Sequence, residues 1–249
     1  MAGRSYKTEA VVLRSFRFGE ADRVLHIYTL DRGRVGALAK GVRKTRSRFG
    51  ARLEPLSHAE LVQHEGRGEL QTVTGVELIR SHHATREHPY RLGIGMVGAE
   101  AMLRLFPEQE RNERAFTALT RFLDLLDEPS HVAERPSVDP LALSFQLKLL
   151  WLSGYLPHLT SCAECGANDT TLVGYSPRAG GAVCRACANQ VEAIALSADG
   201  IAGIEALLAS PLADAVSLGL SERAMRDALR VVTTSYEYNG GFRLRTLSV

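Results

Sequence analysis

The four cysteines of the chain fall in two closely spaced pairs, and this spacing predicts a metal site. The pairs are Cys162-x2-Cys165 and Cys184-x2-Cys187. Each pair lets two thiolates reach one tetrahedral ion from a tight turn, so two pairs complete a four-cysteine zinc site. Four thiolates leave no coordination position open, so we expect one structural Zn²⁺ and not a catalytic ion. A redox pair and an iron–sulfur cluster are the alternatives.

A second chemically distinctive feature is the basic run from Lys40 to Arg52, which contains six cations and no acid. Four of the six are Arg, whose planar guanidinium suits bidentate contact with a phosphate. The formal net charge of the whole chain is only +2, so a basic composition does not explain the run. A contact surface for a polyanion and a solvated loop without a ligand are the two interpretations.

The distribution of charge along the chain favours the first interpretation. Residues 1–80 contain 15 Lys and Arg against 9 Asp and Glu, whereas residues 81–249 contain 15 against 19. The N-terminal part is therefore net basic and the remainder is net acidic. We expect only the N-terminal part to meet a polyanion.

The first eighty residues are predicted to form strands. Five segments are rich in β-branched or aromatic residues or flank turn signals: 6–13, 24–30, 34–39, 59–64 and 69–78. Five short strands in about eighty residues, with an interruption after the third, are typical of a small Greek-key barrel such as the OB-fold. We therefore expect residues 1–80 to be an OB-fold nucleic-acid-binding domain, with the basic run as a surface loop after the third strand.

Beyond residue 80 the apolar pattern becomes helical. Helices are predicted over 90–106, 114–126, 141–155, 198–209 and 222–238, and the proline-rich stretch 127–140 is a loop. Ser197 and Ser221 are expected N-caps of the last two helices. The fold class is thus α+β: a barrel followed by a helical bundle domain, residues 81–249, with the zinc segment inserted at about 157–195.

Four aromatic residues near the basic run could stack on unpaired bases: Phe16, Phe18, Tyr28 and Phe49. Core packing is the favoured interpretation for Tyr28. For the three Phe residues, exposure and burial are both open.

Two other patterns suggest sites but have simpler explanations. Gly93-x-Gly95-x-x-Gly98 has the letters of a dinucleotide-binding fingerprint, but polar residues precede it where that motif needs a buried strand, so we expect close helix packing. His82, His83 and His88 lack carboxylates at metal-ligand spacing and are expected in a solvated linker. His158 could replace a cysteine ligand, although four thiols already suffice.

The chain shows no secretory signal and no apolar run long enough for a membrane span. The expected location is therefore the cytoplasm, without membrane association, and cysteine pairs there indicate metal more often than disulfides.

In this order, the parts of the chain resemble the RecO family of bacterial recombination-mediator proteins. Three stretches carry the resemblance, which spans residues 6–187: Glu20-Ala21-Asp22-Arg23-Val24-Leu25, the basic segment Ala39-Lys40-Gly41-Val42-Arg43-Lys44-Thr45-Arg46-Ser47-Arg48, and Gly154-Tyr155-Leu156-Pro157-His158-Leu159 leading into Cys162-Ala163-Glu164-Cys165-Gly166. The last sixty residues match only as generic helices.

The resemblance implies a binding protein and not an enzyme, acting in DNA repair in the nucleoid. Such proteins bind single- and double-stranded DNA, anneal complementary strands and act with RecR to help RecA load onto strands coated by single-strand-binding protein. The expected DNA contacts are Lys40, Arg43, Lys44, Arg46 and Arg48, with Arg52 and Arg14 as weaker candidates. Some members lack the cysteines, so the zinc is not essential to the family's activity.

Two other classes of protein remain open from the sequence. An RNA-binding or ribosome-associated zinc protein would also use a barrel, a basic loop and a four-cysteine site. A metal-dependent enzyme acting on nucleic acid would need exposed carboxylates near the loop, and Glu20, Asp22 and Asp31 are the nearby candidates.

Overall fold

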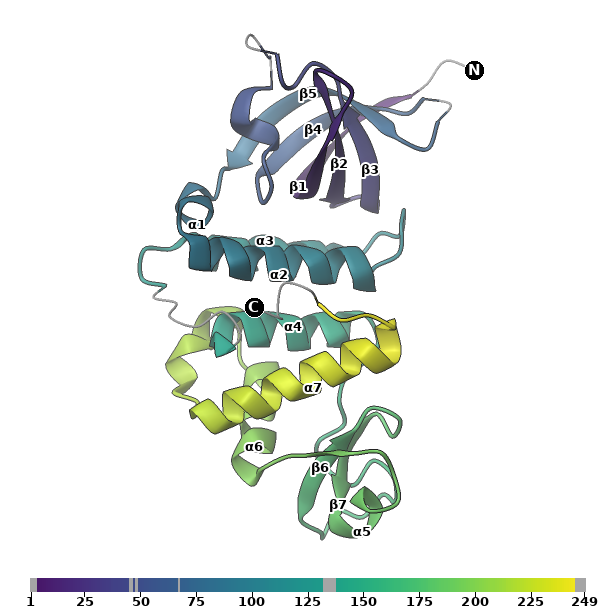
Figure 1. Cartoon of the computed structure of the whole chain (residues 1–249), viewed down its shortest axis with the longest axis vertical. Helices are drawn as coiled ribbons and strands as arrows, with labels where there is room; N and C mark the ends of the chain where they lie inside the picture. The colour runs from purple at the N-terminus through teal and green to yellow at the C-terminus, as the bar shows by residue number, and fades with distance from the viewer. Residues whose placement is uncertain (1–3, 45–46, 48, 67, 132–137, 245–249) are drawn as a thin grey trace. The chain divides into compact units, whose positions relative to one another are not determined.

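The computed structural model describes residues 4–44, 47, 49–66, 68–131 and 138–244. The chain forms two compact units, Met1–His131 and Val132–Val249, and each is described by itself. The α+β class is confirmed, because the strands of a barrel come first and helices follow (Figure 1). The change from strands to helices falls after Arg80, but the first three helices belong to the same compact unit as the barrel.

Five strands close into a barrel in the order β1-β2-β3-β5-β4. Their bounds are Ser5–Phe18 (β1), Asp22–Thr29 (β2), Gly33–Ala39 (β3), His58–His64 (β4) and Gln71–Arg80 (β5). All neighbouring pairs are antiparallel except β3 and β5, whose short contact is parallel. This is the OB-like barrel that the sequence predicts.

Strand β1 is longer than the sequence predicts because an irregularity lets it serve two neighbours. Its first half pairs with β4 and its second half pairs with β2, with a register shift between Val12 and Arg14. A bulge of this kind bends a strand and increases its twist, so the strand can curve around the barrel. The strand therefore continues past Leu13 and ends at Phe18, before the turn that leads into β2.

The barrel core follows the two-residue period of its strands. On β2 and β3 the buried interior side chains are Leu25, Ile27, Val35, Ala37 and Ala39. The segment between β3 and β4 contains a short 3-10 helix, Gly50–Leu53, and Phe49 and Leu53 from this segment join the same core.

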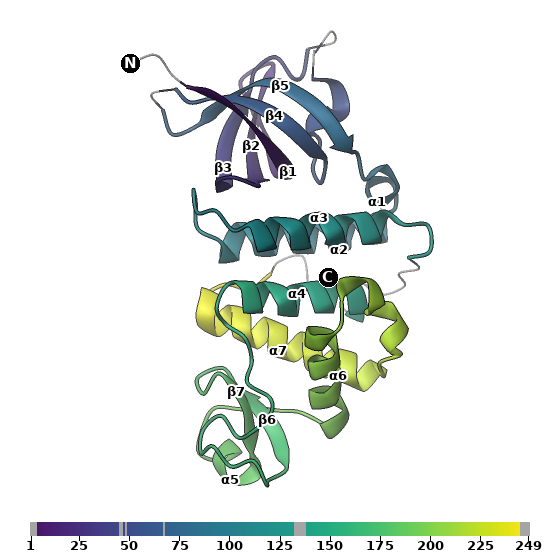
Figure 2. The same ribbon diagram turned by 180° about the vertical axis from the view of Figure 1, so that it is seen from behind.

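Three helices complete the first unit: His83–Glu87 (α1), Pro89–Leu105 (α2) and Glu113–Asp127 (α3). Helices α2 and α3 contact each other and overlap in both views (Figure 1, Figure 2). A Cβ atom on Gly95 of α2 would lie 2.6 Å from Leu56 Cδ1, so the predicted close packing is confirmed at that glycine. The fingerprint lies inside a helix and does not follow a buried strand, which excludes a dinucleotide site of that type.

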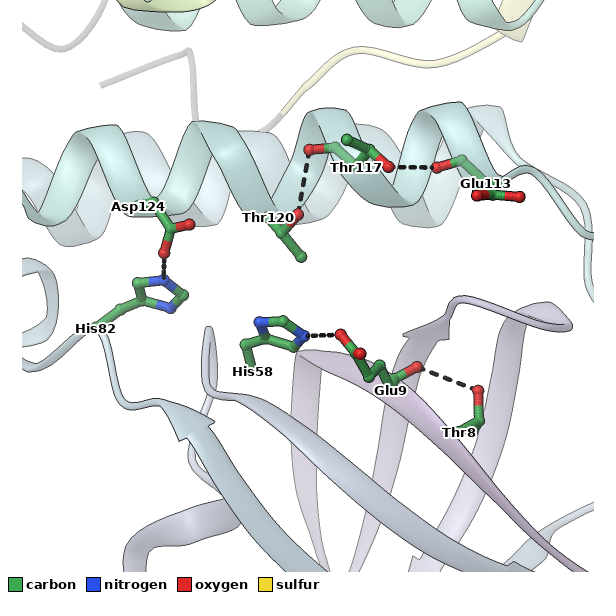
Figure 3. Close-up of polar contacts among 8 residues, drawn as sticks. All are labelled: Thr8, Glu9, His58, His82, Glu113, Thr117, Thr120 and Asp124. Carbon is green, nitrogen blue, oxygen red and sulfur yellow. Dashed lines mark hydrogen bonds and ion pairs between the residues drawn. The ribbon is translucent and has the colours of Figure 1, made fainter.

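Polar contacts also join α3 to the end of the barrel (Figure 3). His82 is 2% exposed, and its ring hydrogen-bonds to the Leu56 carbonyl oxygen at 2.7 Å and to Asp124 of α3 at 3.1 Å. The expectation of a solvated histidine is therefore wrong for His82, whereas His83 and His88 are exposed. His58 on β4 bonds to Glu9 on β1 at 3.0 Å.

The second unit is built around three helices: Pro140–Leu152 (α4), Ala198–Ala209 (α6) and Glu222–Gly240 (α7). Helix α4 is buried on nearly all sides. Ser197 and Ser221 cap α6 and α7 as predicted, each accepting a bond from the backbone N–H three residues later. Ser197 also donates to Asp227 of α7, which joins the two helices. Two 3-10 helices, Leu212–Asp214 and Val216–Leu218, connect α6 to α7.

The cysteine segment inserts between α4 and α6 as a small sheet with a short helix. Its elements are Leu172–Ser176 (β6), Gly181–Cys184 (β7), Arg185–Ala188 (α5) and Ile194–Ala195 (β8), in the sheet order β7-β6-β8. It projects from the helices of its own unit (Figure 2). A buried bond of 2.7 Å between Tyr175 Oη and Ser235 Oγ ties β6 to α7. Among the described helices, none has the length and apolar character needed to cross a bilayer.

Candidate functional site

The basic loop, which we define as Lys40–Arg52, begins beside the turn that joins β1 to β2. Asp22 Oδ1 accepts the backbone N–H of Gly41 at 2.7 Å, and the Ala21 carbonyl accepts the backbone N–H of Arg43 at 2.9 Å. The Arg43 guanidinium donates to the Glu20 carbonyl oxygen at 3.0 Å. Three hydrogen bonds thus fix the start of the loop to this turn.

The far end of the basic loop is fixed in the barrel itself. Phe49 is 1% exposed and packs in the barrel core. Of the two possibilities left open for this residue, burial is therefore the correct one, and its ring is not a stacking platform. The Arg52 guanidinium donates to the carbonyl oxygens of Phe49 at 3.1 Å and Val76 at 3.3 Å. Arg52 therefore has a structural role at the loop exit and remains exposed.

The cations at the start of the loop face solvent. Lys40, Arg43 and Lys44 are exposed, and no carboxylate of the described residues forms an ion pair with them. Arg23, by contrast, pairs with Glu54 at 3.1 Å. Arg46 and Arg48 lie outside the described residues. Exposed cations on an anchored loop produce a local positive potential, which attracts anions in general.

The other predicted aromatic and basic residues near the loop separate into two groups. Tyr28 is fully buried and its ring packs edge-on to Phe106 at 5.8 Å, which confirms core packing. Phe16 and Phe18 are exposed, by 38% and 53%. The Arg14 guanidinium lies 4.3 Å from the centre of the Phe16 ring, so this cation accompanies an exposed aromatic residue and is not part of the loop.

In the part of the chain that the structure describes, the carboxylates near the loop belong to no group of three or more candidate metal ligands. Asp22 instead accepts a hydrogen bond from the backbone N–H of Gly41. Reasoning from the sequence did not predict this anchoring role, although Asp22 lies in one of the stretches that carry the family resemblance. Within the described part of the chain, the cysteine cluster is the only group of three or more candidate ligands close enough to hold a metal ion.

The four cysteines come together as their spacing predicts. Their sulfur atoms all lie within 4.8 Å of one another, and Cys165 Sγ is 4.0 Å from Cys184 Sγ. Sulfur atoms around a tetrahedral ion at about 2.3 Å would lie about 3.8 Å apart, so the cluster fits a bound metal after small movements. None of the four is in a disulfide. His158 is not part of the cluster and bonds instead to Ser161 Oγ at 2.6 Å.

The local electrostatics of the cluster also favour a cation. Burial of Cys162 acts to raise its pKa, but hydrogen bonds from the backbone N–H groups of Cys165, Cys184 and Glu164 prevail and lower that pKa to about 6. Hydrogen bonding to the Cys165 side chain, together with burial, raises the pKa of Cys187 to about 12. Sulfur atoms this close cannot all ionise without a positive charge between them, and a metal ion supplies that charge.

Comparison with known proteins agrees with this architecture. Residues 1–82 match the family model described as Recombination protein O N terminal, and residues 86–248 match Recombination protein O C terminal. The chain is 40% identical over 231 residues to the DNA repair protein RecO of Rubrobacter xylanophilus, covering 90% of this chain and 89% of the relative.

Other RecO proteins are similar over almost the whole chain. The DNA repair protein RecO of Heliobacterium modesticaldum is 34% identical over 252 residues, 99% of this chain and 89% of the relative. That of an Anaeromyxobacter species is 35% identical over 243 residues, 96% of this chain and 92% of the relative. The chain therefore belongs to the RecO family, non-enzymatic mediator proteins of DNA repair and recombination.

Proposed function

We propose that this protein binds single- and double-stranded DNA, anneals complementary strands and, with a RecR-like partner, helps RecA load onto strands coated by single-strand-binding protein. The observation that carries the proposal is the basic loop, held at both ends by the barrel and exposing Lys40, Arg43 and Lys44 without carboxylate partners among the described residues. Arg46 and Arg48 belong to the same proposed site by sequence, with Arg52 and Arg14 at its margins.

Annealing suits a site of this kind for a physical reason. Two strands repel each other through their phosphates, and a cluster of cations lowers that repulsion without reading sequence. Anchoring keeps the cations together, so less loop entropy is lost when DNA binds. No bond-making chemistry is needed.

In this proposal the two predicted domains have different tasks. Residues 1–80 bind DNA, and residues 81–249, which are net acidic, offer surfaces for the RecR-like and single-strand-binding partners. The cytoplasmic nucleoid is the proposed location, since the ligand is DNA.

We further assign Zn²⁺ to the cysteine cluster of this proposal. Four cysteines gathered in one cluster are typical of structural zinc, and a full ligand shell leaves no position for catalysis. The ion would hold the ends of the inserted segment together, and the segment's small sheet would depend on it.

A salt series of fluorescence anisotropy with single-stranded DNA tests the proposal. A variant with Ala at Arg43, Lys44, Arg46 and Arg48 should bind more weakly, and its log–log salt slope should be shallower by about 3, because each lost phosphate contact removes about 0.7. The matched control removes four exposed, ion-paired arginines elsewhere: Arg111, Arg178, Arg226 and Arg243. It has the same net charge and should keep the wild-type slope.

Two results would contradict the proposal. Equal losses in the loop variant and the control would mean that net charge, and not this loop, governs binding. A strong preference of the wild-type protein for RNA over DNA of equal length would favour the alternative of an RNA-binding zinc protein.

A further inference from the structure

The outer face of strands β1 to β3 carries exposed aromatic and apolar side chains next to the basic loop. We define this outer face by Arg14, Phe16, Phe18, Val24, His26 and Leu38. Phe18 pairs with Asp22, Phe16 pairs with Val24, and Arg14 pairs with His26. Directly paired residues share a face of the sheet. Leu25, Ile27, Ala37 and Ala39 point into the barrel core, so the residues between them point away from it.

Rows of side chains cross this face from β1 to β3. Val24 is paired with Leu38 and His26 with Gly36, so the middle rows read Phe16–Val24–Leu38 and Arg14–His26–Gly36. A Cβ atom at Gly36 would lie 2.8 Å from Leu70 Cδ2, which places Leu70, just before β5, over the β3 side of the face. The face thus offers a strip of apolar and aromatic side chains between Phe18 and Leu70.

The exposure of the two phenylalanines on this strip is unusual for side chains of their size. Phe16 is 38% exposed and Phe18 is 53% exposed, whereas apolar residues earlier in the same strand, such as Val12 and Leu13, are buried. The Phe16 ring packs edge-on to His26 at 5.5 Å and lies beneath the Arg14 guanidinium. These two contacts restrain the ring before any ligand binds, which reduces the entropy lost on binding, and because Arg14 covers one face of the ring, a base that stacks on Phe16 must use the opposite face.

We propose that this outer face is a stacking platform for the unpaired bases of single-stranded DNA, with Phe16 and Phe18 as the stacking rings. The proposal rests on the proposed function, because it names the form of DNA that the same site prefers. The basic loop meets phosphates of either single or double strands, whereas the platform can engage only bases that are not enclosed in a duplex.

Charge complementarity identifies nucleic acid as the occupant. Asp22, which is paired with Phe18, is the one carboxylate in the three rows of side chains that contain Phe18, Phe16 and Arg14. Its Oδ1 atom accepts the hydrogen bond from the Gly41 N–H. Arg14 lies on the face, and Lys40, Arg43 and Lys44 line the adjacent loop. The OB-fold in general uses the strand 2–3 face together with neighbouring loops to bind oligonucleotides.

Stacking is compatible with annealing. A base that lies against an aromatic ring uses its π-face and keeps its Watson–Crick edge free for a complementary strand. The platform would therefore hold one strand in an open arrangement while the basic loop lowers the repulsion of the second strand.

The test compares three ligands of equal length: single-stranded DNA, an abasic strand that has the same backbone but no bases, and duplex DNA. The variant Phe16→Leu with Phe18→Leu keeps apolar side chains but removes the rings. Its affinity for single-stranded DNA should fall about ten- to a hundredfold, while its affinity for the abasic strand, its affinity for the duplex and its salt slope stay at the wild-type values.

Three further proteins make the result decisive. Phe18→Trp should bind single-stranded DNA as the wild type does, because a larger ring still stacks. Tyr238→Leu removes an aromatic side chain, 56% exposed on α7, and should change nothing. Phe18→Leu alone alters the more exposed ring, and it should still lose affinity for single-stranded DNA even if the double variant folds poorly.

Opposite outcomes have distinct meanings. If wild type and the leucine variants bind all three ligands equally, the stacking platform is refuted while DNA binding by the loop stands; the exposed rings would then be free to meet a protein. If the wild type binds none of the ligands, the proposed function fails first, and the platform fails with it.

Discussion

The carboxylate of Asp22 accepts the backbone N–H of Gly41 at 2.7 Å and fixes the basic loop to the β1–β2 turn. Gly41 has a φ of +69°, a left-handed conformation that glycine adopts without steric cost. By its negative charge alone, Asp22 would weaken the binding of DNA to the neighbouring cations. Its hydrogen bond to the loop backbone should have the opposite effect, because this bond keeps the start of the loop, and the cations on it, in one place.

Replacing Asp22 with Ala should therefore weaken DNA binding, although the variant gains one unit of positive charge. Loss of the anchor should reduce affinity for single-stranded DNA on the order of threefold to tenfold, since a hydrogen bond to a charged group contributes about 1.5–3 kcal/mol and only part of that reaches the ligand. Asp22→Asn keeps an acceptor oxygen and should recover most of the affinity. Tighter binding by Asp22→Ala, measured by anisotropy, would show that the acid acts only through its charge.

The cysteine cluster predicts that each chain binds one metal ion and that the inserted segment needs this ion to fold. Metal analysis of the purified protein should find one Zn²⁺, and Cys184→Ser should lose it, because a three-thiolate site binds less tightly. Hydrogen exchange should then become fast in β6 and β7 and stay slow in the barrel strands, which belong to the other compact unit. Unchanged protection of β6 and β7 after chelation would show that the segment folds without metal.

Much of this architecture could be predicted from the sequence because its signals are local. Five strand segments, five helices, two serine N-caps and the cysteine spacing each depend on residues close together in the chain. The predicted strand over 6–13 stops short of Phe18, since a bulge near Leu13 interrupts the alternating pattern on which such a prediction depends. The strands β6 and β7 escaped prediction because each is only four or five residues long.

The details of the binding site were less predictable because they depend on contacts between distant residues. Phe49 is flanked in the sequence by Arg48 and Gly50 and resembles an exposed loop residue, yet the barrel core buries it. His82 looks like part of a polar linker, but Leu56 and Asp124, 26 and 42 positions away, provide its hydrogen-bond partners. No local pattern reports such pairings.

His58 should make the barrel less stable in mild acid. Burial lowers its pKa, the nearby His82 lowers it further, and the bond to Glu9 compensates only in part. Because the pKa in the folded protein lies below the ordinary value of about 6.5, unfolding takes up a proton as the pH falls from about 6.5 towards the folded pKa. The stabilisation present at higher pH is lost across that window.

Urea unfolding between about pH 8 and pH 5 can isolate this effect. His58→Gln should lower stability near pH 8, because the imidazole packs edge-on to Phe116, and its stability should fall less with acid than that of the wild type. Some acid dependence should remain, because burial also lowers the pKa of His26. Identical slopes for the two proteins would show that His58 does not carry the acid sensitivity.

A matched pair of glycines separates backbone strain from steric exclusion in the first unit. Gly33 and Gly19 both have positive φ, +63° and +55°. A Cβ atom at Gly33 would lie 1.9 Å from the Glu110 carbonyl oxygen, whereas nothing lies within 4 Å of one at Gly19. Gly19→Ala should cost about 1 kcal/mol of unfolding free energy, the usual penalty for a left-handed residue that carries a Cβ.

Gly33→Ala should cost the same penalty and, in addition, the energy of moving the backbone at Glu110, for a total of about 3 kcal/mol or more. Gly33 lies at the β2–β3 turn, and Glu110 lies in the connection between α2 and α3. If the Gly33→Ala substitution pushes these two segments apart, the helices should unfold separately from the barrel. Urea unfolding of both variants, followed by circular dichroism, measures the two costs. Equal destabilisation of the two would mean that the chain at Glu110 yields freely and that the turn does not hold the helices against the barrel.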